Sequence, residues 1–243
     1  MLRLVLAILA CLLLAEAVRG AVVIGGTRVV FPGQARDVSL KVENKGAEPA
    51  LVQVWIDDGD ETSSPATAHA PFAITPPAFR IDPGQAHTLR IVHVGEAAPK
   101  EKEALYWLNV LEIPPKPTTT QGANVLQFAF RHRLKLFHRP EAMPPPTVRT
   151  TAALRWKLER DGDTEVLKVE NPSPYHVSFN SVALVPDKGA SATATLRGGM
   201  VAPGATMRFP LPATARGAQG GKVDFVTIND FGAPIPGSTA LER

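Results

Sequence analysis

Short strand-like runs, each bounded by Gly, Pro, Asn or Asp, recur along the whole chain after residue 20. No window of that region sustains a helical period over three turns. Alternation with a period of two residues is typical of strands, and many short strands separated by turn residues indicate a β-sandwich. We therefore expect an all-β protein. The expected strands are 22–31, 37–44, 50–57, 87–94, 104–113 and 124–137 before Pro140, and 154–160, 165–171, 176–185, 207–211 and 222–230 after it.

Three consecutive prolines, Pro144 to Pro146, divide these strands into two sets. Proline donates no backbone hydrogen bond and cannot continue a strand, so this stretch is expected to be a stiff linker. The two sets predict one domain over residues 21–140, a linker over 141–149 and a second domain over 150–243. Both halves contain Val-Glu-Asn before a turn with proline, which fits two sandwiches of the same type. In the second half, Asp161-Gly162 predicts a two-residue hairpin turn.

Residues 1–20 have the pattern of a signal peptide, with a positively charged start, an apolar segment and small residues suited to cleavage. The apolar segment is too short for a comfortable membrane span. We expect cleavage after Gly20, with Ala17 as the alternative. Cys11, the only cysteine, is then removed. An exported chain without disulfides must be stabilised by burial of its cores alone.

The charge of the exported chain is close to balanced. Residues 1–20 hold two of the 26 basic and one of the 23 acidic side chains, so their removal lowers the formal net charge from +3 to +2. The basic residues are dispersed, except for a concentration over residues 131–139. This mild excess argues against a nucleic-acid-binding protein.

The longest expected strand has two unlike faces. Its polar entry loop, residues 113–124, contains Pro and Gly and is expected at the surface, and its far end leads into the basic cluster and the linker. An alternating apolar edge beside a positively charged junction favours capture of an extended peptide. The alternative is that the apolar side chains fill their own domain's core. One face carries Leu126, Phe128, Phe130, His132, Leu134 and Leu136, and the other carries Gln127, Ala129, Arg131, Arg133 and Lys135.

Seven segments together carry a resemblance to a known family. They are GGTRVVFP, ALVQVWID, ITPPAFRIDPGQAHTLRI, ALYWLNVLEIPPKP, ANVLQFAFRHRLKLFHRP, NPSPYHVSF and VTINDFGA. In this collinear order they cover nearly all of the chain after residue 20, and they closely resemble the periplasmic pilus-assembly chaperones of the chaperone–usher pathway. The resemblance implies two immunoglobulin-like β-sandwich domains in an L or boomerang arrangement, with no catalytic residue, no cofactor and no metal.

The resemblance also implies the functional residues. Chaperones of this family lend a strand to pilus subunits that lack their own last strand, and Leu126, Phe128 and Phe130 match the apolar side chains that plug the open subunit core. Arg28 and Lys135 match the two cations that bind the subunit's C-terminal carboxylate. Two cations on one carboxylate fix the register of the lent strand, because a slip by one residue turns every side chain to the other face.

A second set of residues matches a structural feature of the family. Glu103, Arg139 and Asp230 correspond to an ion-pair network that orients the two domains, and the alternative is three ordinary exposed charges. His138 stands where a phenol is frequent in the family. The short loop before the lent strand, without cysteine, resembles the short-loop subgroup that builds rod-like adhesive pili.

The resemblance implies partners and a location. We expect pilus subunits and an outer-membrane usher as partners, with the protein in the periplasm. An unprotected apolar edge also makes a self-capping homodimer of the free chaperone physically plausible. The identity of the cognate subunits, the usher and the pilus type stays open.

Other classes of exported protein fit less well. The chain has no Gly-x-Ser-x-Gly elbow, no His-Glu-x-x-His and no Cys-x-x-Cys, which disfavours an enzyme. The alternative is a non-catalytic secreted immunoglobulin-like binding or adhesion module. Carbohydrate sites favour exposed aromatic side chains, yet aromatics are 6% of the residues, and Trp55, Trp107 and Trp156 lie in expected strands where core burial is expected. A pilus subunit is a shorter single domain that usually has a disulfide.

Overall fold

The computed structural model describes residues 21–95, 101–116, 126–162, 164–189 and 193–242. The signal peptide expected over residues 1–20, with Cys11 and both cleavage points, lies outside the described residues. So does most of the polar loop expected over residues 113–124, of which the structure describes only the part up to Lys116.

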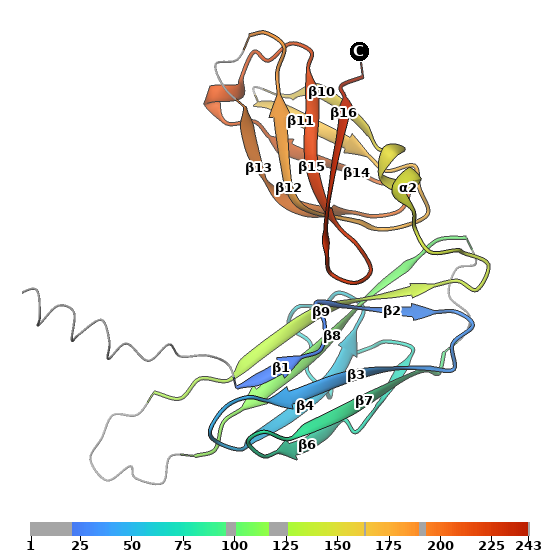
Figure 1. Cartoon of the computed structure of the whole chain (residues 1–243), viewed down its shortest axis with the longest axis vertical. Helices are drawn as coiled ribbons and strands as arrows, with labels where there is room; N and C mark the ends of the chain where they lie inside the picture. Colours follow the sequence, from blue (N-terminus) through green and yellow to red (C-terminus); the bar gives the residue numbers. More distant parts are fainter. Residues whose placement is uncertain (1–20, 96–100, 117–125, 163, 190–192, 243) are drawn as a thin grey trace, which may run out of the picture.

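The first domain consists of two sheets packed face to face (Figure 1). The core between them contains side chains from both sheets, including Val42, Leu89, Leu108 and Leu136, each with no exposed surface. One sheet has the order β1-β3-β7-β5, and the other has the order β2-β9-β8-β4-β6. The strands are β1 (Val22–Ile24), β2 (Arg28–Pro32), β3 (Asp37–Asn44), β4 (Ala50–Asp57), β5 (Phe72–Thr75), β6 (Ala78–Ile81), β7 (Ala86–His93), β8 (Ala104–Ile113) and β9 (Phe130–Arg139).

The second domain is a smaller sandwich with its own core. Trp156 is completely buried at its centre, where it stacks on Phe209 and Phe225. The sheets have the orders β10-β11-β14 and β13-β12-β15-β16. The elements are α2 (Val148–Ala152), β10 (Arg155–Asp161), β11 (Thr164–Glu170), β12 (Val177–Val185), β13 (Ala194–Val201), β14 (Thr206–Pro210), the 3-10 turn η1 (Ala213–Ala215), β15 (Lys222–Ile228) and β16 (Pro234–Ala240).

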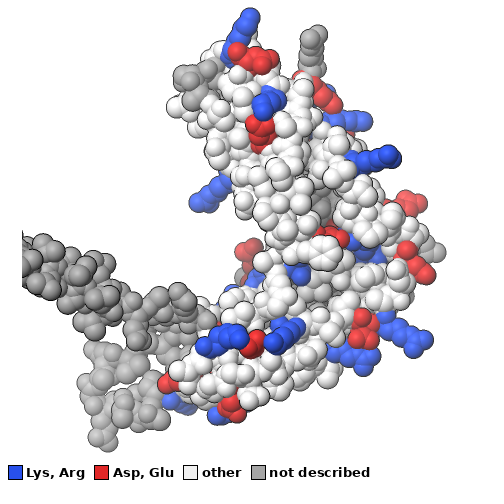
Figure 2. Space-filling view, in the orientation of Figure 1, with Lys and Arg blue, Asp and Glu red and all other residues white. Residues whose placement is uncertain are grey.

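The two domains meet at an angle, so that the molecule has an L shape (Figure 1). The tip of the β15–β16 hairpin reaches down to the first domain, near β2 and β9. The space-filling view shows a hollow at the junction on one side, with Lys, Arg, Asp and Glu side chains dispersed over both lobes (Figure 2). The predicted all-β fold of two immunoglobulin-like domains is thus confirmed.

Several expected strands differ from those observed. The expected strand over residues 22–31 is two strands, β1 and β2, which belong to different sheets. Two glycines, Gly25 and Gly26, separate them where the chain crosses between sheets. In the second domain the predicted hairpin is present, but Asp161 pairs with Thr164, so Gly162 rather than Asp161 begins the turn. Gly162 has a φ of 60°, which favours glycine.

The expected strand over residues 124–137 begins later than predicted. The strand β9 starts at Phe130, and Leu126 and Phe128 precede it without strand pairing. The partner strand explains the difference: Phe130 pairs with Glu112, and β8 ends at Ile113. Two prolines follow at 114 and 115, and prolines cannot donate ladder hydrogen bonds to a longer strand.

Candidate functional site

The strand β9 has one incompletely paired edge. On one side it pairs with β8 from Phe130 to His138. On the other side it pairs with β2 in parallel, and this pairing begins only at Arg28 opposite Lys135. Within the described residues, the β9 edge from Phe130 to Leu134 therefore has no neighbouring strand. An unpaired edge is a template for strand addition, and any added strand must end where β2 begins.

Two cations stand at that end of the open edge. Arg28 and Lys135 are direct partners across β2 and β9, so their side chains leave the same face of the sheet. The guanidinium Nη1 of Arg28 donates to the carbonyl of Ile228 at 3.0 Å, and Nζ of Lys135 donates to the hydroxyl of Ser178 at 3.1 Å. Both contacts come from the second domain. Strands β2 and β9 thus meet the second domain through Arg28 and Lys135, the two residues predicted as the anchor.

The cation pair is not neutralised by the described part of the chain. Both side chains are half-buried, and neither forms an ion pair with a described carboxylate; the buried Nε of Arg28 has no hydrogen-bond partner there either. Burial lowers the pKa of Lys135, and repulsion by Arg28 lowers it further. Burial also lowers the pKa of Arg28, against the attraction of Asp230 and Glu103. An anion between the two cations would relieve their repulsion.

The predicted apolar plugs are exposed. Leu126 is 77%, Phe128 56% and Phe130 36% exposed, although the next two apolar residues of the same face, Leu134 and Leu136, are buried in the core. These three side chains therefore do not fill their own domain's core, which was the alternative. The amide of Gln127 donates to the carbonyls of Pro114 and Pro115 at 3.0 and 2.8 Å, which links this segment to the chain beyond β8.

The three residues matched to the interdomain network lie in contact. Arg139, at the end of β9, donates from Nη2 to Glu103 at 2.8 Å and from Nη1 to Asp230 at 2.9 Å. Glu103 precedes β8 in the first domain, whereas Asp230 follows β15 in the second. Burial alone would lower the pKa of Arg139, but its bonds to the two carboxylates raise it above the ordinary value. The ion pairs therefore join the domains at the junction itself.

Two further residues of this junction were not predicted. The backbone N–H and the Nδ1 atom of His176, from the second domain, both lie 3.0 Å from Oε1 of Glu103. The ring of Tyr175 lies below the Arg139 guanidinium at 5.5 Å, and its hydroxyl donates to the carbonyl of Pro144 in the linker. The segment NPSPYHVSF carried the family resemblance, but nothing in its spacing marked these side chains as partners of Glu103 and Arg139.

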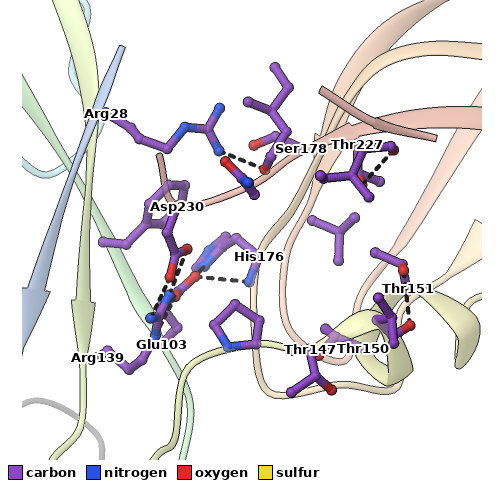
Figure 3. Close-up of a pocket in the computed structure, with 17 residues that line it drawn as sticks. Arg28, Glu103, Arg139, Thr147, Thr150, Thr151, His176, Ser178, Thr227 and Asp230 are labelled. Atoms are coloured by element: carbon purple, nitrogen blue, oxygen red, sulfur yellow. Dashed lines mark hydrogen bonds and ion pairs between the residues drawn. The ribbon is translucent and has the colours of Figure 1, made fainter. Parts of the chain in front are cut away.

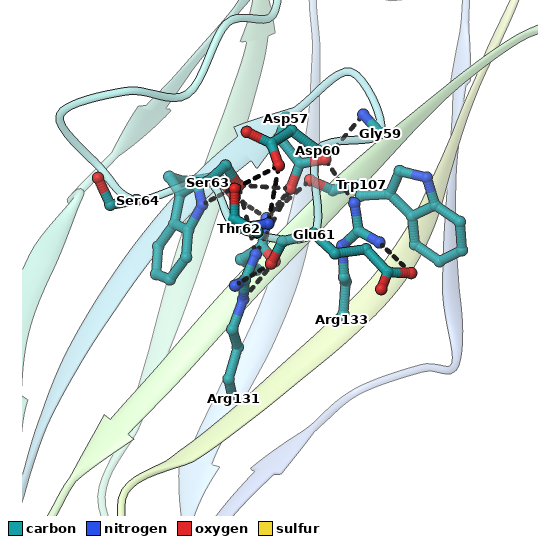
Figure 4. A network of polar contacts seen from close by, with 12 residues as sticks. Asp57, Gly59, Asp60, Glu61, Thr62, Ser63, Ser64, Trp107, Arg131 and Arg133 are labelled. Carbon is teal, nitrogen blue, oxygen red and sulfur yellow. Dashed lines mark hydrogen bonds and ion pairs between the residues drawn. The ribbon is translucent and has the colours of Figure 1, made fainter.

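Two other basic residues of β9, Arg131 and Arg133, make contacts on the outer face of the sheet, which is the face opposite the core (Figure 4). Arg131 lies over Trp55 at 4.8 Å, and Arg133 lies over Trp107 at 4.4 Å. Arg133 also donates to the fully buried Asp57 at 2.7 Å. Trp107 is only half-buried, because this outer face has no second sheet to cover it, so its expected core position is wrong. Trp156 is buried in the core of its domain as expected, whereas Trp55 is buried under Arg131 on this outer face and outside the core cluster.

Asp57 is the centre of this outer network. Burial alone would raise its pKa, but hydrogen bonds from Arg133, Asn109, Gly59 and Ser63 lower it below the ordinary value. The carboxylate accepts from Asn109 at 2.7 Å and from Ser63 at 3.0 Å. This fixes β4, β8 and β9 relative to one another beside the open edge. The concentration of basic residues in β9 thus has two roles, anchoring the strand and, at Lys135, facing the junction.

A pocket of about 340 Å³ lies at the junction. Figure 3 shows Arg28, Glu103 and Arg139 of the first domain facing Ser178 and Thr227 of the second. The described residues contain no cluster of three or more His, Cys, Asp or Glu side chains that could hold a metal ion. The pocket lining combines the cations of Arg28 and Arg139 with the carboxylates of Glu103 and Asp230, together with hydroxyls and apolar side chains.

Comparison with protein families agrees with this geometry. The profile of the pili and flagellar-assembly chaperone PapD N-terminal domain matches residues 21–144, and that of the pili assembly chaperone PapD C-terminal domain matches residues 149–239. The chain belongs to the PapD family of pilus-assembly chaperones. Together the two profiles span both sandwiches and the junction between them.

Individual relatives match this chaperone along nearly its whole length. It is 36% identical over 234 residues to the probable fimbrial chaperone YadV of Escherichia coli (strain K12), covering 95% of this chain and 94% of that protein. It is 39% identical over 232 residues to the chaperone protein FimB/FhaD of Bordetella pertussis, covering 94% and 91%. Chaperoning is a non-catalytic function.

Solved structures show the same two-domain arrangement. The Pseudomonas aeruginosa CupB2 chaperone superposes with a TM-score of 0.75 at 36% identity, covering 90% of this chaperone and 100% of that chain. The SafB chaperone of Salmonella enterica, solved in complex with the SafA pilin, gives a TM-score of 0.75 at 29% identity, covering 93% and 99%. None of the helices in the described ranges of this chaperone combines the length and apolar content of a membrane span.

Proposed function

We propose that this chaperone captures pilus subunits by donor-strand complementation, with Leu126, Phe128 and Phe130 as apolar plugs and Arg28 and Lys135 as the anchor for the subunit's C-terminal carboxylate. The observation that carries the proposal is the position of the cation pair at the closed end of the unpaired β9 edge. A subunit strand added there has its chain end where a carboxylate is needed.

The direction of the added strand follows from the same geometry. β2 occupies the edge from Lys135 onward, so a strand that ends at Arg28 and Lys135 must extend back along Phe130 to Leu134. Its chain then runs parallel to β9, as β2 itself does. Backbone hydrogen bonds along this edge would give affinity, while the carboxylate anchor sets the register.

In this proposal the apolar plugs and the carboxylate anchor contribute differently to binding. Burying the three exposed apolar side chains contributes roughly 1.5–3 kcal/mol each before the cost of association. The carboxylate contributes position, because charge-assisted hydrogen bonds to two fixed cations tolerate little displacement. The exposure of these three apolar side chains in the free protein supports a role of this surface in binding a partner.

The wider cellular role extends this proposal. Residues 1–20 would direct export and be removed after Gly20 or Ala17, leaving domains over residues 21–140 and 150–243 joined by the linker 141–149. The chaperone would act in the periplasm and deliver its subunits to an outer-membrane usher. The unpaired β9 edge and its exposed phenylalanines support self-capping as a homodimer when no subunit is bound. The short connection from Ile113 to Phe130 supports membership of the short-loop subgroup.

Co-purification tests the proposal. Candidate subunits encoded nearby are co-expressed in the periplasm with wild type, Arg28→Ala, Lys135→Ala and the control Arg36→Ala, whose side chain is exposed in the first domain. We expect wild type and the control to recover a subunit and the two anchor variants to lose it. Equal recovery by all four proteins would remove the carboxylate-anchor mechanism, while the family fold would stand.

A further inference from the structure

Glu112 is a carboxylate buried at the end of β8. Its side chain is 4% exposed, and two residues of the same face of the strand, Leu108 and Val110, are completely buried in the core. Among the residues that the structure describes, no Lys, Arg or His forms an ion pair with it. Burying an ionised carboxylate is costly unless hydrogen bonds and a cation replace the lost water.

Both oxygens of Glu112 bind the backbone at residues 21 and 22. Oε1 accepts from the backbone N–H of Ala21 at 3.0 Å, and Oε2 accepts from the backbone N–H of Val22 at 3.1 Å. Val22 is the first residue of β1, which belongs to the other sheet of the sandwich. The two bonds therefore join the sheets and direct the carboxylate toward the nitrogen of Ala21.

The position of Ala21 is fixed by further contacts. Its carbonyl accepts from the backbone N–H of Lys45 at 2.7 Å, beside the first pair of β1 and β3, Val22 with Asn44. Gly46 packs so closely that a Cβ atom at this position would clash with the Cβ atom of Ala21. The nitrogen of Ala21 thus has one defined position, and it faces Glu112.

Removal of the expected signal peptide changes the charge at this nitrogen. In the full chain the nitrogen of Ala21 is a neutral amide. Cleavage after Gly20 is a hydrolysis: one water molecule is consumed, and the Gly20–Ala21 bond is replaced by a carboxylate on Gly20 and an ammonium group on Ala21. An α-amino group is mostly protonated at pH 7. The processed chain therefore has a positive charge at the atom that the structure places 3.0 Å from Oε1 of Glu112.

We propose that Glu112 is the binding site for the N-terminal ammonium group of the processed chain, so that cleavage after Gly20 gives this buried carboxylate its cation. The inference rests on the proposed export and cleavage, and it goes beyond subunit capture. A neutral hydrogen bond becomes a charge-assisted one, which is roughly twice as strong. A chain that is uncleaved, or cleaved after Ala17, lacks this ion pair because the nitrogen of Ala21 stays an amide.

The ion pair lies beside the strand that we propose is lent to subunits. Glu112 is the register partner of Phe130, which is the first residue of β9 and a proposed plug. Binding of Glu112 to the chain start therefore fixes the end of β8 next to the exposed segment that contains Leu126 and Phe128. By this route the first domain reaches its full stability only after the signal peptide has been removed.

The test compares processed chains that differ in the charges at this site. One chain begins at Ala21, and the other has the neutral extension Ser-Gly-Ser before Ala21, which keeps the N–H donor but removes its charge. Each is made with Glu112 and with Glu112→Gln, exported with the same heterologous signal peptide and unfolded in urea. Mass spectrometry of the wild type, exported with its own residues 1–20, identifies the first residue of the processed chain, which we expect to be Ala21.

We expect Glu112→Gln to lower the folding equilibrium constant about tenfold more in the chain that begins at Ala21 than in the extended chain. Glu48→Gln is the matched control, because Glu48 is exposed in the turn after Gly46 and only its backbone carbonyl forms a hydrogen bond with the described residues. It should affect both chains equally. The rate of acylation of the α-amino group is an independent measurement, and it should be several-fold lower with Glu112 than with Glu112→Gln.

The outcomes separate this site from the proposed subunit capture. A wild-type chain that begins at Val18, equal effects of Glu112→Gln in the two chains, or equal acylation rates would each overturn the N-terminal site. If Glu112→Gln does not fold, equal stability of the two chains with Glu112 would overturn it as well. Subunit recovery that depends on Arg28 would leave the function standing in all these cases. A tenfold difference without recovery of any subunit would support the site and refute capture.

Discussion

Arg28 and Lys135 are side-by-side partners on parallel strands, and they place two half-buried cations where the edge of β9 stops being available. Neighbouring cations repel, so this pair is unfavourable in the free protein unless an anion is bound. Burial lowers the pKa of Lys135, and repulsion by Arg28 lowers it further. This cation pair is the site that we propose for the chain end of a subunit.

The first prediction concerns the length of the subunit. A C-terminal extension of three alanines should abolish capture, because β2 occupies the β9 edge beyond Lys135 and leaves no room for further strand. Pull-down of extended and unextended subunits measures the effect. The control extends the subunit at its N-terminus by the same residues. Undiminished recovery of the C-terminally extended subunit would contradict the blocked-edge geometry.

The second prediction separates stability from function at Lys135. The Lys135→Met variant removes the repulsion with Arg28 and loses the hydrogen bond to Ser178, so its free energy of unfolding should stay within about 1 kcal/mol of wild type. Its capture of subunits should fall at least about tenfold, because one of the two carboxylate partners is gone. Urea unfolding and pull-down give the two values. Lys188→Met should change neither, because the side chain of Lys188 is exposed and its β-bridge to Gln219 uses only the backbone.

The third prediction concerns the junction between the domains. Arg139→Ala leaves the buried carboxylate of Glu103 without its cation, and stranding a buried charge costs about 3–5 kcal/mol. The measurement is urea unfolding, with small-angle scattering to follow the angle between the domains. Arg90→Ala removes an exposed ion pair with Asp37 and should have no measurable effect. If the two variants are equally stable, the ion pairs of Arg139 at the junction contribute nothing to the free energy of unfolding.

The fourth prediction tests the exposed plugs. Phe128→Asp should leave the free energy of unfolding unchanged, since Phe128 is exposed, yet it should prevent capture because a carboxylate would enter the subunit core. Phe31→Ala, in the completely buried core, should instead lower stability by about 3–5 kcal/mol. A Phe128→Asp variant that still binds subunits would exclude this residue as a plug.

The fifth prediction concerns acid stability. His138 is buried, stacks on His93 at 4.5 Å, and lies edge-on to Phe31 and Phe72. Burial, with repulsion by His93, lowers the pKa of His138 to about 4. Because the unfolded chain protonates this residue at higher pH than the folded one, stability is present above about pH 6.5 and falls as pH is lowered toward about 4.

The size of this effect can be isolated with one substitution. We expect a loss of about 1–2 kcal/mol from His138 between about pH 6.5 and pH 4, which allows for partial access of water. His138→Phe removes the titrating group in an aromatic environment, so the difference in unfolding free energy between wild type and variant should grow as pH falls. A pH-independent difference would show that His138 is not the titrating group.

Three residues matched through the family resemblance lie together at the junction, in a way that no local sequence pattern could show. Glu103, Arg139 and Asp230 come from three separate segments, yet they form one ion-pair cluster. His176 joins the same cluster and was missed, because its only signal was membership of a matching segment. Contacts between distant segments depend on topology, which periodicity within a strand does not encode.

The sequence by itself determined the class of fold, the two halves and most internal strands, because a strand with two neighbours buries an alternating face. Strands β3, β4 and β8 have the predicted limits. The four strands that the pattern did not predict, β5, β6, β13 and β16, all lie at sheet edges. An edge strand has a single neighbour and tolerates proline, as β16 does at Pro234 and Pro236, so its sequence pattern is weak.

Only the tertiary structure decided where the open edge begins and ends. The open edge of β9 begins at Phe130, because the prolines after β8 leave Leu126 and Phe128 beyond the ladder. It ends before Lys135, because β2 pairs with β9 from Arg28 onward. Both limits depend on which strands become neighbours. The side chains that we propose to act in subunit capture can therefore be read from the sequence, whereas the unpaired edge that we propose to accept a subunit strand arises from packing between segments far apart along the chain.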